Sequence, residues 1–206
     1  SEQRTFEICL EIETLACEAQ AELGHIPKED AKTIREKAKF VLAEVMEIEQ
    51  ITNHDVIAFL ENVASYAGPA CRWMHQGMTS SDVLDTTLAV QTAQASDILL
   101  KDLRDLREVI AKRAKEFKMT PMIGRSHGIH AEPITFGLKL ALMHDEFGRA
   151  LERLEQVQPR IRVGKLSGAV GTHAHLDPPV EEKVCKPPGL TPATLATQVG
   201  QRHRLP

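Results

Sequence analysis

The chain has 206 residues, of which 42% are apolar, and its formal net charge at pH 7 is −4. This apolar content can fill the core of one large domain or two small ones, which excludes a disordered chain. Acidic and basic residues are interspersed, so neither nucleic acid nor an anionic membrane is expected as a partner. The chain has no apolar run of roughly 18 residues, and its four cysteines form no C-x-x-C pair, which favours a reduced, cytoplasmic protein without a membrane span.

The first 79 residues carry the periodicity of short amphipathic helices. Apolar residues recur every three to four positions, which predicts helices over residues 5–23, 30–39 and 42–49 and a fourth from Asn53 or Asp55 to Tyr66. Gly24 and Gly68 follow the first and the last of these segments and mark their ends. We therefore expect a compact helical domain over residues 1–79.

Two much longer helices are predicted further along the chain. Ser80, Ser81 and Asp82 offer N-cap side chains to an apolar pattern that continues to Phe117 without Gly or Pro, a helix of roughly 55 Å. A second long pattern runs over residues 133–159. Apolar stripes of this length need more cover than this chain provides, so we expect a helical bundle formed with other copies of the chain. The fold class is all-α, with residues 80–206 as the first part of this bundle domain.

A glycine-rich segment follows the second long helix. Gly164, Gly168 and Gly171 are spaced through it, which predicts a loop, and a short helix is expected over residues 179–186. The segment lacks the preceding strand of a Rossmann loop and the Gly-Lys-Ser/Thr ending of a phosphate-binding loop. A nucleotide cofactor motif is not supported, and tight turns explain the glycines equally well.

Polar residues gather at four predicted helix boundaries. The clusters are Asn53 to Asp55; His75 with Thr79 to Asp82; Arg125 to His130; and Thr197 and Gln198 with Arg202. A helix N-terminus presents free N–H groups and the positive end of the helix dipole, so the segment before the first long helix can seat a phosphate or a carboxylate. Taken alone, however, such a cluster before a helix is more often an ordinary cap than an anion site.

Residues 124–133 (GRSHGIHAEP) are the most informative stretch of the chain. They place two histidines in a short connection where Gly, Pro and small polar residues usually suffice. Histidine transfers protons near neutral pH, which makes His127 a candidate general acid; the alternative is a histidine that only hydrogen-bonds the loop backbone. His127 and His130 have an H-x-x-H spacing, but Gly128 lies between them and neither an H-E-x-x-H pattern nor a cysteine accompanies them. No metal site is expected.

Four motifs, taken together and in order, resemble the bacterial-type adenylosuccinate lyases of the fumarase and aspartase superfamily. They are residues 52–59 (TNHDVIAF), 77–86 (GMTSSDVLDT), 124–139 (GRSHGIHAEPITFGLK) and 164–172 (GKLSGAVGT). The resemblance implies β-elimination of fumarate from adenylosuccinate and from the succinylated aminoimidazole carboxamide ribotide of purine synthesis. It also implies a succinyl-nucleotide ligand, no metal or organic cofactor, and a homotetramer in which three protomers build each active site.

The resemblance also assigns roles to residues. His127 matches the general acid that protonates the leaving nitrogen, and His130 supports its loop. The residues that match substrate-binding positions are Arg4, Asn53, His54, Asp55, His75, Thr79, Ser80 and Gln198. The chain departs from the family at Thr5, where a tyrosine is usual, at Ser126, where a threonine is usual, and in the tail after Gln201.

The family's catalytic base is a serine in the signature SSxMPxKxNP, which these 206 residues do not contain. We therefore expect the chain to be a fragment that by itself binds weakly and turns over nothing. Two alternatives remain open. One is another lyase or a cycloisomerase of the superfamily, such as an argininosuccinate lyase or a carboxymuconate cycloisomerase. The other is a non-catalytic helical interaction module.

Overall fold

The computed structural model describes residues 1–201 and contains two compact units. The first unit comprises Ser1–Thr92 together with the chain from Arg160 onward, and the second comprises Ala93–Pro159. These boundaries differ from those of the expected domains, 1–79 and 80–206, because the segment from Arg160 onward belongs to the same compact unit as the N-terminal helices. The domain boundary expected after residue 79 stays a prediction. Arg202, expected in the fourth polar cluster, lies outside the described residues.

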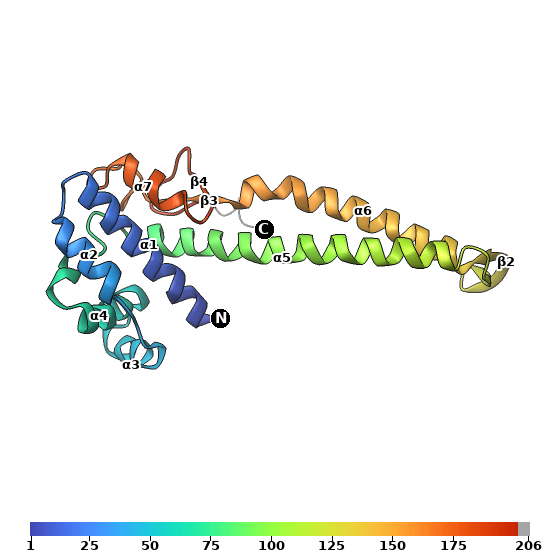
Figure 1. Ribbon diagram of the computed structural model, residues 1–206, viewed down its shortest axis with the longest axis horizontal. Helices are drawn as coiled ribbons and strands as arrows, with labels where there is room; N and C mark the ends of the chain where they lie inside the picture. The colour runs from blue at the N-terminus through green and yellow to red at the C-terminus, as the bar shows by residue number, and fades with distance from the viewer. Residues whose placement is uncertain (202–206) are drawn as a thin grey trace. The chain divides into compact units, whose positions relative to one another are not determined.

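Over the described residues the fold is all-α, which confirms the expected class. The first unit begins with α1 (Glu2–Glu22), α2 (Lys28–Lys37), α3 (Leu42–Thr52), α4 (Asp55–Ala67) and the 3₁₀ helix η1 (Gly68–Trp73), shown in Figure 1. All four predicted helices of this region are present. Within residues 1–201, no helix is long and apolar enough to cross a membrane.

The junction between α3 and α4 differs from the expectation that Asn53 or Asp55 caps α4. Asn53 ends α3 in the left-handed conformation, with φ of 51°, which asparagine tolerates better than most residues. The next residue, His54, is extended and occupies the N-cap position, where its Nδ1 accepts a hydrogen bond from the Ile57 N–H at 3.4 Å. The predicted cap was therefore wrong, and a histidine provides it.

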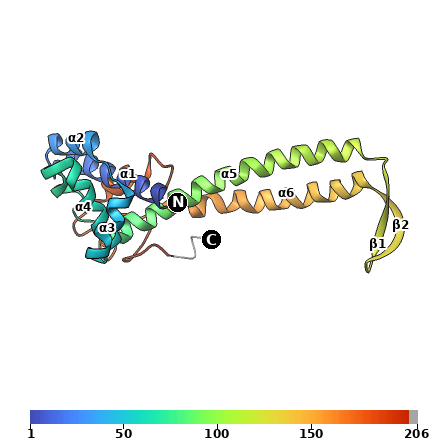
Figure 2. The ribbon, with the colours of Figure 1, turned by 90° about the horizontal axis from the view of Figure 1, so that it is seen from below.

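Aromatic and aliphatic side chains from these helices form the core of the first unit. Phe59 packs against Phe6, with ring centroids 5.2 Å apart, and against Phe40 at 5.8 Å. Ile34 and Val63 are fully buried around them. Figure 2 shows α1 among the neighbouring helices, and α1 packs against both α2 and α7. Burial of these large apolar groups stabilises the unit, at about 1.5–3 kcal/mol for each fully buried aliphatic or Phe side chain.

The two long helices are α5 (Ser80–Glu116) and α6 (Phe136–Ile161). In the second unit they lie side by side, as both ribbon views show (Figures 1 and 2). Phe117, just after α5, packs on Phe136 at the start of α6 with ring centroids 5.2 Å apart, and Arg104 pairs with Glu155 at 2.6 Å. Pro159 lies inside the last turns of α6 rather than ending it.

The connection between the long helices is a β-hairpin, not the expected loop. Strand β1 (Pro121–Ser126) pairs antiparallel with β2 (Ile129–Thr135), and Arg125 lies opposite His130. The sequence does not alternate between apolar and polar residues here because most residues on both faces of the hairpin are exposed in this chain. Helix α6 consequently starts three residues later than the predicted start at Pro133.

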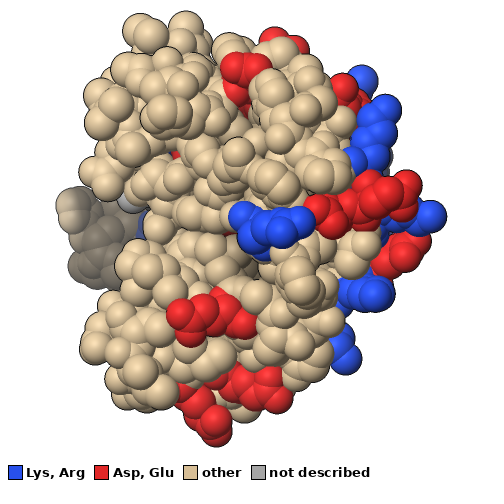
Figure 3. All heavy atoms as spheres, turned by 90° about the vertical axis from the view of Figure 1, so that its left-hand side faces the viewer, with Lys and Arg blue, Asp and Glu red and all other residues tan. Residues whose placement is uncertain are grey.

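The segment after α6 returns to the first unit. Strand β3 (Val163–Gly164) pairs in parallel with β4 (Thr191–Pro192), and α7 (Pro178–Cys185) confirms the short helix predicted over 179–186. Leu166, Val180 and Val184 are fully buried and join the core. On the face of the first unit in Figure 3, basic and acidic side chains lie close together along one edge, and most of the remaining face carries neither.

Candidate functional site

A buried ion pair joins the start of α5 to the glycine-rich segment. The Lys165 ammonium lies 2.6 Å from Asp82 Oδ1, and the two side chains are 2% and 0% exposed. Burying both charges is costly unless their remaining donors and acceptors are also satisfied. Both groups therefore need further hydrogen-bond partners.

Backbone groups provide those partners. Asp82 accepts hydrogen bonds from the N–H groups of Thr79 at 2.9 Å, Ser167 at 3.0 Å and Gly168 at 3.1 Å. Lys165 Nζ donates to the carbonyl oxygens of Gly168 at 3.1 Å and Gln198 at 2.8 Å. The ion pair thus fixes the backbone of two predicted binding residues, Thr79 and Gln198, together with the segment between them.

A cavity of about 540 Å³ adjoins this network. Its walls come from residues 76–78 and from residues within 167–175. The wall formed by residues 76–78 lies between His75 and Thr79 in the chain, so two predicted binding residues flank this wall. Position 77 requires a glycine, because its φ is 74° and a Cβ there would collide with the carbonyl group of His175. A cavity of this size accommodates a small metabolite.

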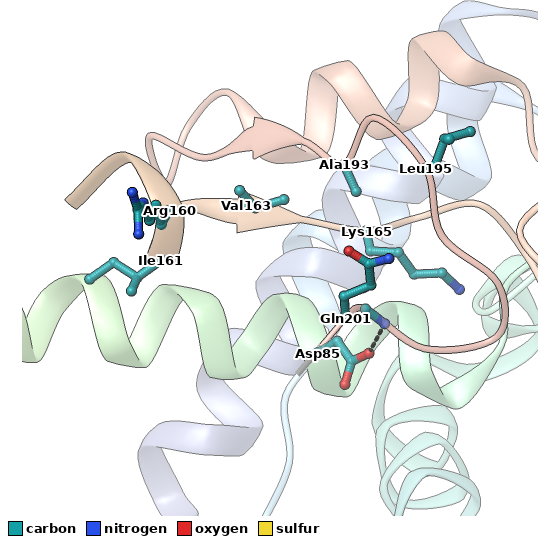
Figure 4. A pocket seen from close by; sticks show the side chains of 9 residues that line it. Asp85, Arg160, Ile161, Val163, Lys165, Ala193, Leu195 and Gln201 are labelled. Carbon is teal, nitrogen blue, oxygen red and sulfur yellow. Dashed lines mark hydrogen bonds between the residues drawn. The ribbon is translucent and has the colours of Figure 1, made fainter. Parts of the chain in front are cut away.

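A second, much smaller pocket of about 30 Å³ lies beside Lys165 and is drawn in Figure 4. Asp85 lines it and accepts a hydrogen bond from the Gly200 N–H at 2.6 Å. Arg160 and Gln201 also contribute to its wall. This volume suits one or two water molecules rather than a nucleotide, so the larger cavity is the better candidate site.

His75 is held by a buried carboxylate from α1. Its Nδ1 lies 2.6 Å from Glu13 Oε1, and its backbone N–H donates to Glu13 Oε2 at 2.8 Å. Glu13 is completely buried. Burial by itself would lower the pKa of His75, but the hydrogen bond and charge of Glu13, with the charge of Asp82, outweigh it and raise the pKa.

The remaining predicted binding residues of the first unit make local contacts. Asn53, His54 and Asp55 stay together at the junction of α3 and α4, where Asp55 accepts from the Val56 N–H at 2.7 Å. Arg4 is half-exposed on α1 and pairs with Glu7 at 3.0 Å. Ser80 is the first residue of α5, and the Gln198 side chain is exposed.

His127 belongs to the second unit and occupies the turn of the β-hairpin. It is exposed and adopts φ of 54°, next to Gly128 at φ of 75°. Arg125 donates to the Gly128 carbonyl oxygen at 3.4 Å and so braces the turn. In the part of the chain that the structure describes, no three His, Cys, Asp or Glu side chains are grouped to hold a metal.

Comparison with known proteins agrees with the four motifs. A family model described as lyase matches residues 1–204. The chain belongs to this lyase family. Among curated relatives, the adenylosuccinate lyase of Bacillus subtilis (strain 168) is 53% identical over 99% of the chain, and that of Staphylococcus saprophyticus is 50% identical over the same share.

A solved structure extends this likeness to the fold. The chain resembles the β-carboxy-cis,cis-muconate cycloisomerase of Acinetobacter calcoaceticus with a TM-score of 0.89 and 28% identity, over 99% of this chain and 50% of that one. The chain spans 47% of the length of the two curated relatives and corresponds to their N-terminal portion.

Sequence reasoning missed two residues of this site and misread a third. Glu13 lies four residues from both Cys9 and Cys17, so it occupies the buried face of α1, and a carboxylate on an apolar stripe is a detectable signal. Asp82 was interpreted as part of a cap, although its carboxylate also reaches residues 167 and 168. Lys165 lies within the motif of residues 164–172, but no local pattern indicates its partner, which is 83 positions away in the chain.

Proposed function

We propose that this chain is part of an adenylosuccinate lyase, in which it binds the succinyl-nucleotide and supplies the general acid. The observation that carries the proposal is the 53% identity to a curated adenylosuccinate lyase over 99% of the chain. The identity to the muconate cycloisomerase is only 28%, although the folds agree. Adenylosuccinate and the succinylated aminoimidazole carboxamide ribotide are the proposed substrates, and the proposed location is the cytoplasm.

The reaction breaks a C–N bond by β-elimination. A base removes a proton from the carbon next to the departing group, an acid protonates the nitrogen, and fumarate is released. His127 is the proposed acid, because histidine is the residue type that most often transfers protons in enzymes and this imidazole is exposed at a braced turn. The base is proposed to be a serine in the family's SSxMPxKxNP signature, which these residues do not contain. No metal or organic cofactor is needed for these steps.

The proposed substrate contacts are those that the family resemblance implies. Ser80 presents its backbone N–H group at the start of α5, where an anionic group is favoured. The Thr79 N–H is already donated to Asp82, so the proposed contact of Thr79 is through its hydroxyl. His75 adds a group whose raised pKa favours the cation. The further proposed contacts are Arg4, Asn53, His54, Asp55 and Gln198. The substrate carries carboxylates and a phosphate, so cationic and N–H groups are the chemistry that its recognition requires.

A homotetramer with shared active sites completes the proposal. In the second unit, large apolar side chains remain exposed along both long helices, among them Ile98 (62%), Leu138 (59%) and Leu142 (64%). Apolar stripes on long helices are typically covered by further helices of a bundle. In such an assembly, His127 of one protomer could protonate a substrate that is held by the binding residues of other protomers.

The test uses the protein expressed from its complete gene and follows fumarate release. His127→Ala is expected to lower kcat by roughly 10²–10⁴-fold, the usual contribution of general acid catalysis. The matched control is His25→Ala, which removes an exposed histidine paired with Asp177 and should keep wild-type kinetics. A panel of adenylosuccinate, argininosuccinate and carboxymuconate separates the members of the superfamily. A His127→Ala protein within about threefold of wild type would refute His127 as the general acid. Absence of fumarate release by the wild-type protein would instead favour a non-catalytic interaction module.

A further inference from the structure

Glu13 is a buried carboxylate whose two oxygens both form hydrogen bonds with one residue, His75. Oε1 lies 2.6 Å from the ring Nδ1, and Oε2 accepts the His75 backbone N–H at 2.8 Å. Glu13 belongs to α1 and lies 62 positions before His75 in the chain. A buried charge is retained in a core only with such partners, so this contact is a specific feature of the fold.

The contact decides which ring nitrogen carries a proton. An ionised carboxylate only accepts hydrogen bonds, so at 2.6 Å His75 Nδ1 must be the donor and must be protonated. The second hydrogen bond holds the His75 backbone at φ of 62°, a conformation that non-glycine residues rarely adopt. The ring is thus held in one direction with a proton on Nδ1, and Nε2 is the nitrogen that remains for another partner.

We propose that Glu13 is a positioning residue that keeps a proton on His75 Nδ1 and stabilises the imidazolium, whose Nε2–H then donates to a carboxylate or phosphate group of the substrate. The inference rests on the proposed function, because it deepens the role of His75 as a substrate contact. It concerns the partner of His75 in the core, which neither the motifs nor the comparisons name.

Location and charge support this role. The His75 side chain is 22% exposed, so its ring is not sealed in the core, and the chain continues directly into residues 76–78 that line the 540 Å³ cavity. The charges that act on His75 are those of Glu13 on α1 and Asp82 on α5, both negative. They favour an imidazolium that donates from Nδ1 to Glu13 and from Nε2 to an anion.

The sharpest test is Glu13→Gln, which preserves shape but replaces one acceptor oxygen with an amide donor. When the remaining oxygen accepts the His75 backbone N–H, the amide faces Nδ1, which must then lose its proton. We expect ¹⁵N NMR of the histidine rings in the protein from the complete gene to show His75 protonated at Nδ1 in the wild type. In the variant the neutral ring should be protonated at Nε2 instead. The matched control, Glu18→Gln, removes a carboxylate of α1 that pairs with Arg35 and should leave His75 unchanged.

Kinetics provide a second readout in the same protein. Glu13→Gln should raise KM for adenylosuccinate about tenfold, the usual loss for a weakened charge-assisted hydrogen bond, with a smaller change in kcat. Because the variant lowers the pKa of His75, KM should begin to rise at a lower pH than in the wild type. A scaffolding role alone would destabilise the fold without moving this pH profile.

A second variant keeps the proposal testable if Glu13→Gln does not fold. His75→Asn retains an N–H donor near the position of Nδ1 but has no counterpart of Nε2, so it should fold and raise KM about 10- to 100-fold. Wild-type KM in His75→Asn, or a ring still protonated at Nδ1 in Glu13→Gln, would overturn the inference. Absence of fumarate release by the wild-type protein would instead overturn the proposed function, since the NMR measurement needs no turnover.

Discussion

Replacing Lys165 by methionine tests whether the buried ion pair stabilises the first unit. The change removes the ammonium group from a site that is 2% exposed and keeps most of the side-chain volume. Asp82 would keep its N–H donors from Thr79, Ser167 and Gly168 but lose its counter-charge at 2.6 Å. Removing one partner of a buried pair leaves an uncompensated charge, so we expect the free energy of unfolding to fall by about 3–5 kcal/mol.

Urea unfolding at fixed protein concentration, followed by far-UV circular dichroism, measures this change. Arg35→Met is the matched control, since Arg35 is 37% exposed and pairs with Glu11 and Glu18 in solvent, where such pairs contribute about 0–1 kcal/mol. A double-mutant cycle with Asp82→Asn should give a coupling energy of about 2–3 kcal/mol. If Lys165→Met cost no more than Arg35→Met, the reasoning about the buried pair would be refuted.

Two further predictions concern the cavity wall and the cysteines. Gly77→Ala should destabilise the protein more than Gly24→Ala in the same urea assay. Both glycines have positive φ, but only at Gly77 would a Cβ collide with a backbone group, that of His175. Equal decreases in the free energy of unfolding for the two variants would contradict this packing. At pH 8, an aromatic disulfide reagent should label Cys71 first in the folded protein, because the other three thiols, those of Cys9, Cys17 and Cys185, are buried. Burial also raises the pKa of Cys9 to about 11 and the pKa of Cys185 to about 12, so little reactive thiolate forms there. Rapid labelling of more than one thiol without urea would show that the core is more open than the structure indicates.

The helices could be predicted from the sequence because their signals are local. Apolar periodicity identified α1 to α7 within a few residues of their ends, and Gly24 and Gly68 marked two of those ends correctly. The hairpin around His127 was missed for a physical reason. Both of its faces are largely exposed in this chain, so its residues carry no apolar alternation that a reader of the sequence could detect.

For the candidate site too, only some residues could be predicted from the sequence. The family resemblance pointed to His75, Thr79 and Gln198 as substrate contacts, but it did not show which groups hold them in place. The supporting groups come from distant parts of the chain: Glu13 contacts His75 across 62 positions, and Asp82 contacts Gly168 across 86. No local pattern encodes such pairs, because their partners meet only when the helices pack.

By itself, the sequence determined the all-α class, the order of the helices and the likeness to adenylosuccinate lyases, since propensity, periodicity and motif wording are properties of neighbouring residues. The tertiary structure alone decided that Asp82 holds a loop through Lys165 rather than only capping α5, and that a carboxylate of α1 fixes the ring of His75. Buried charges are tolerated only where folding brings complementary groups within hydrogen-bond distance, and that distance is set by the packing of the whole unit.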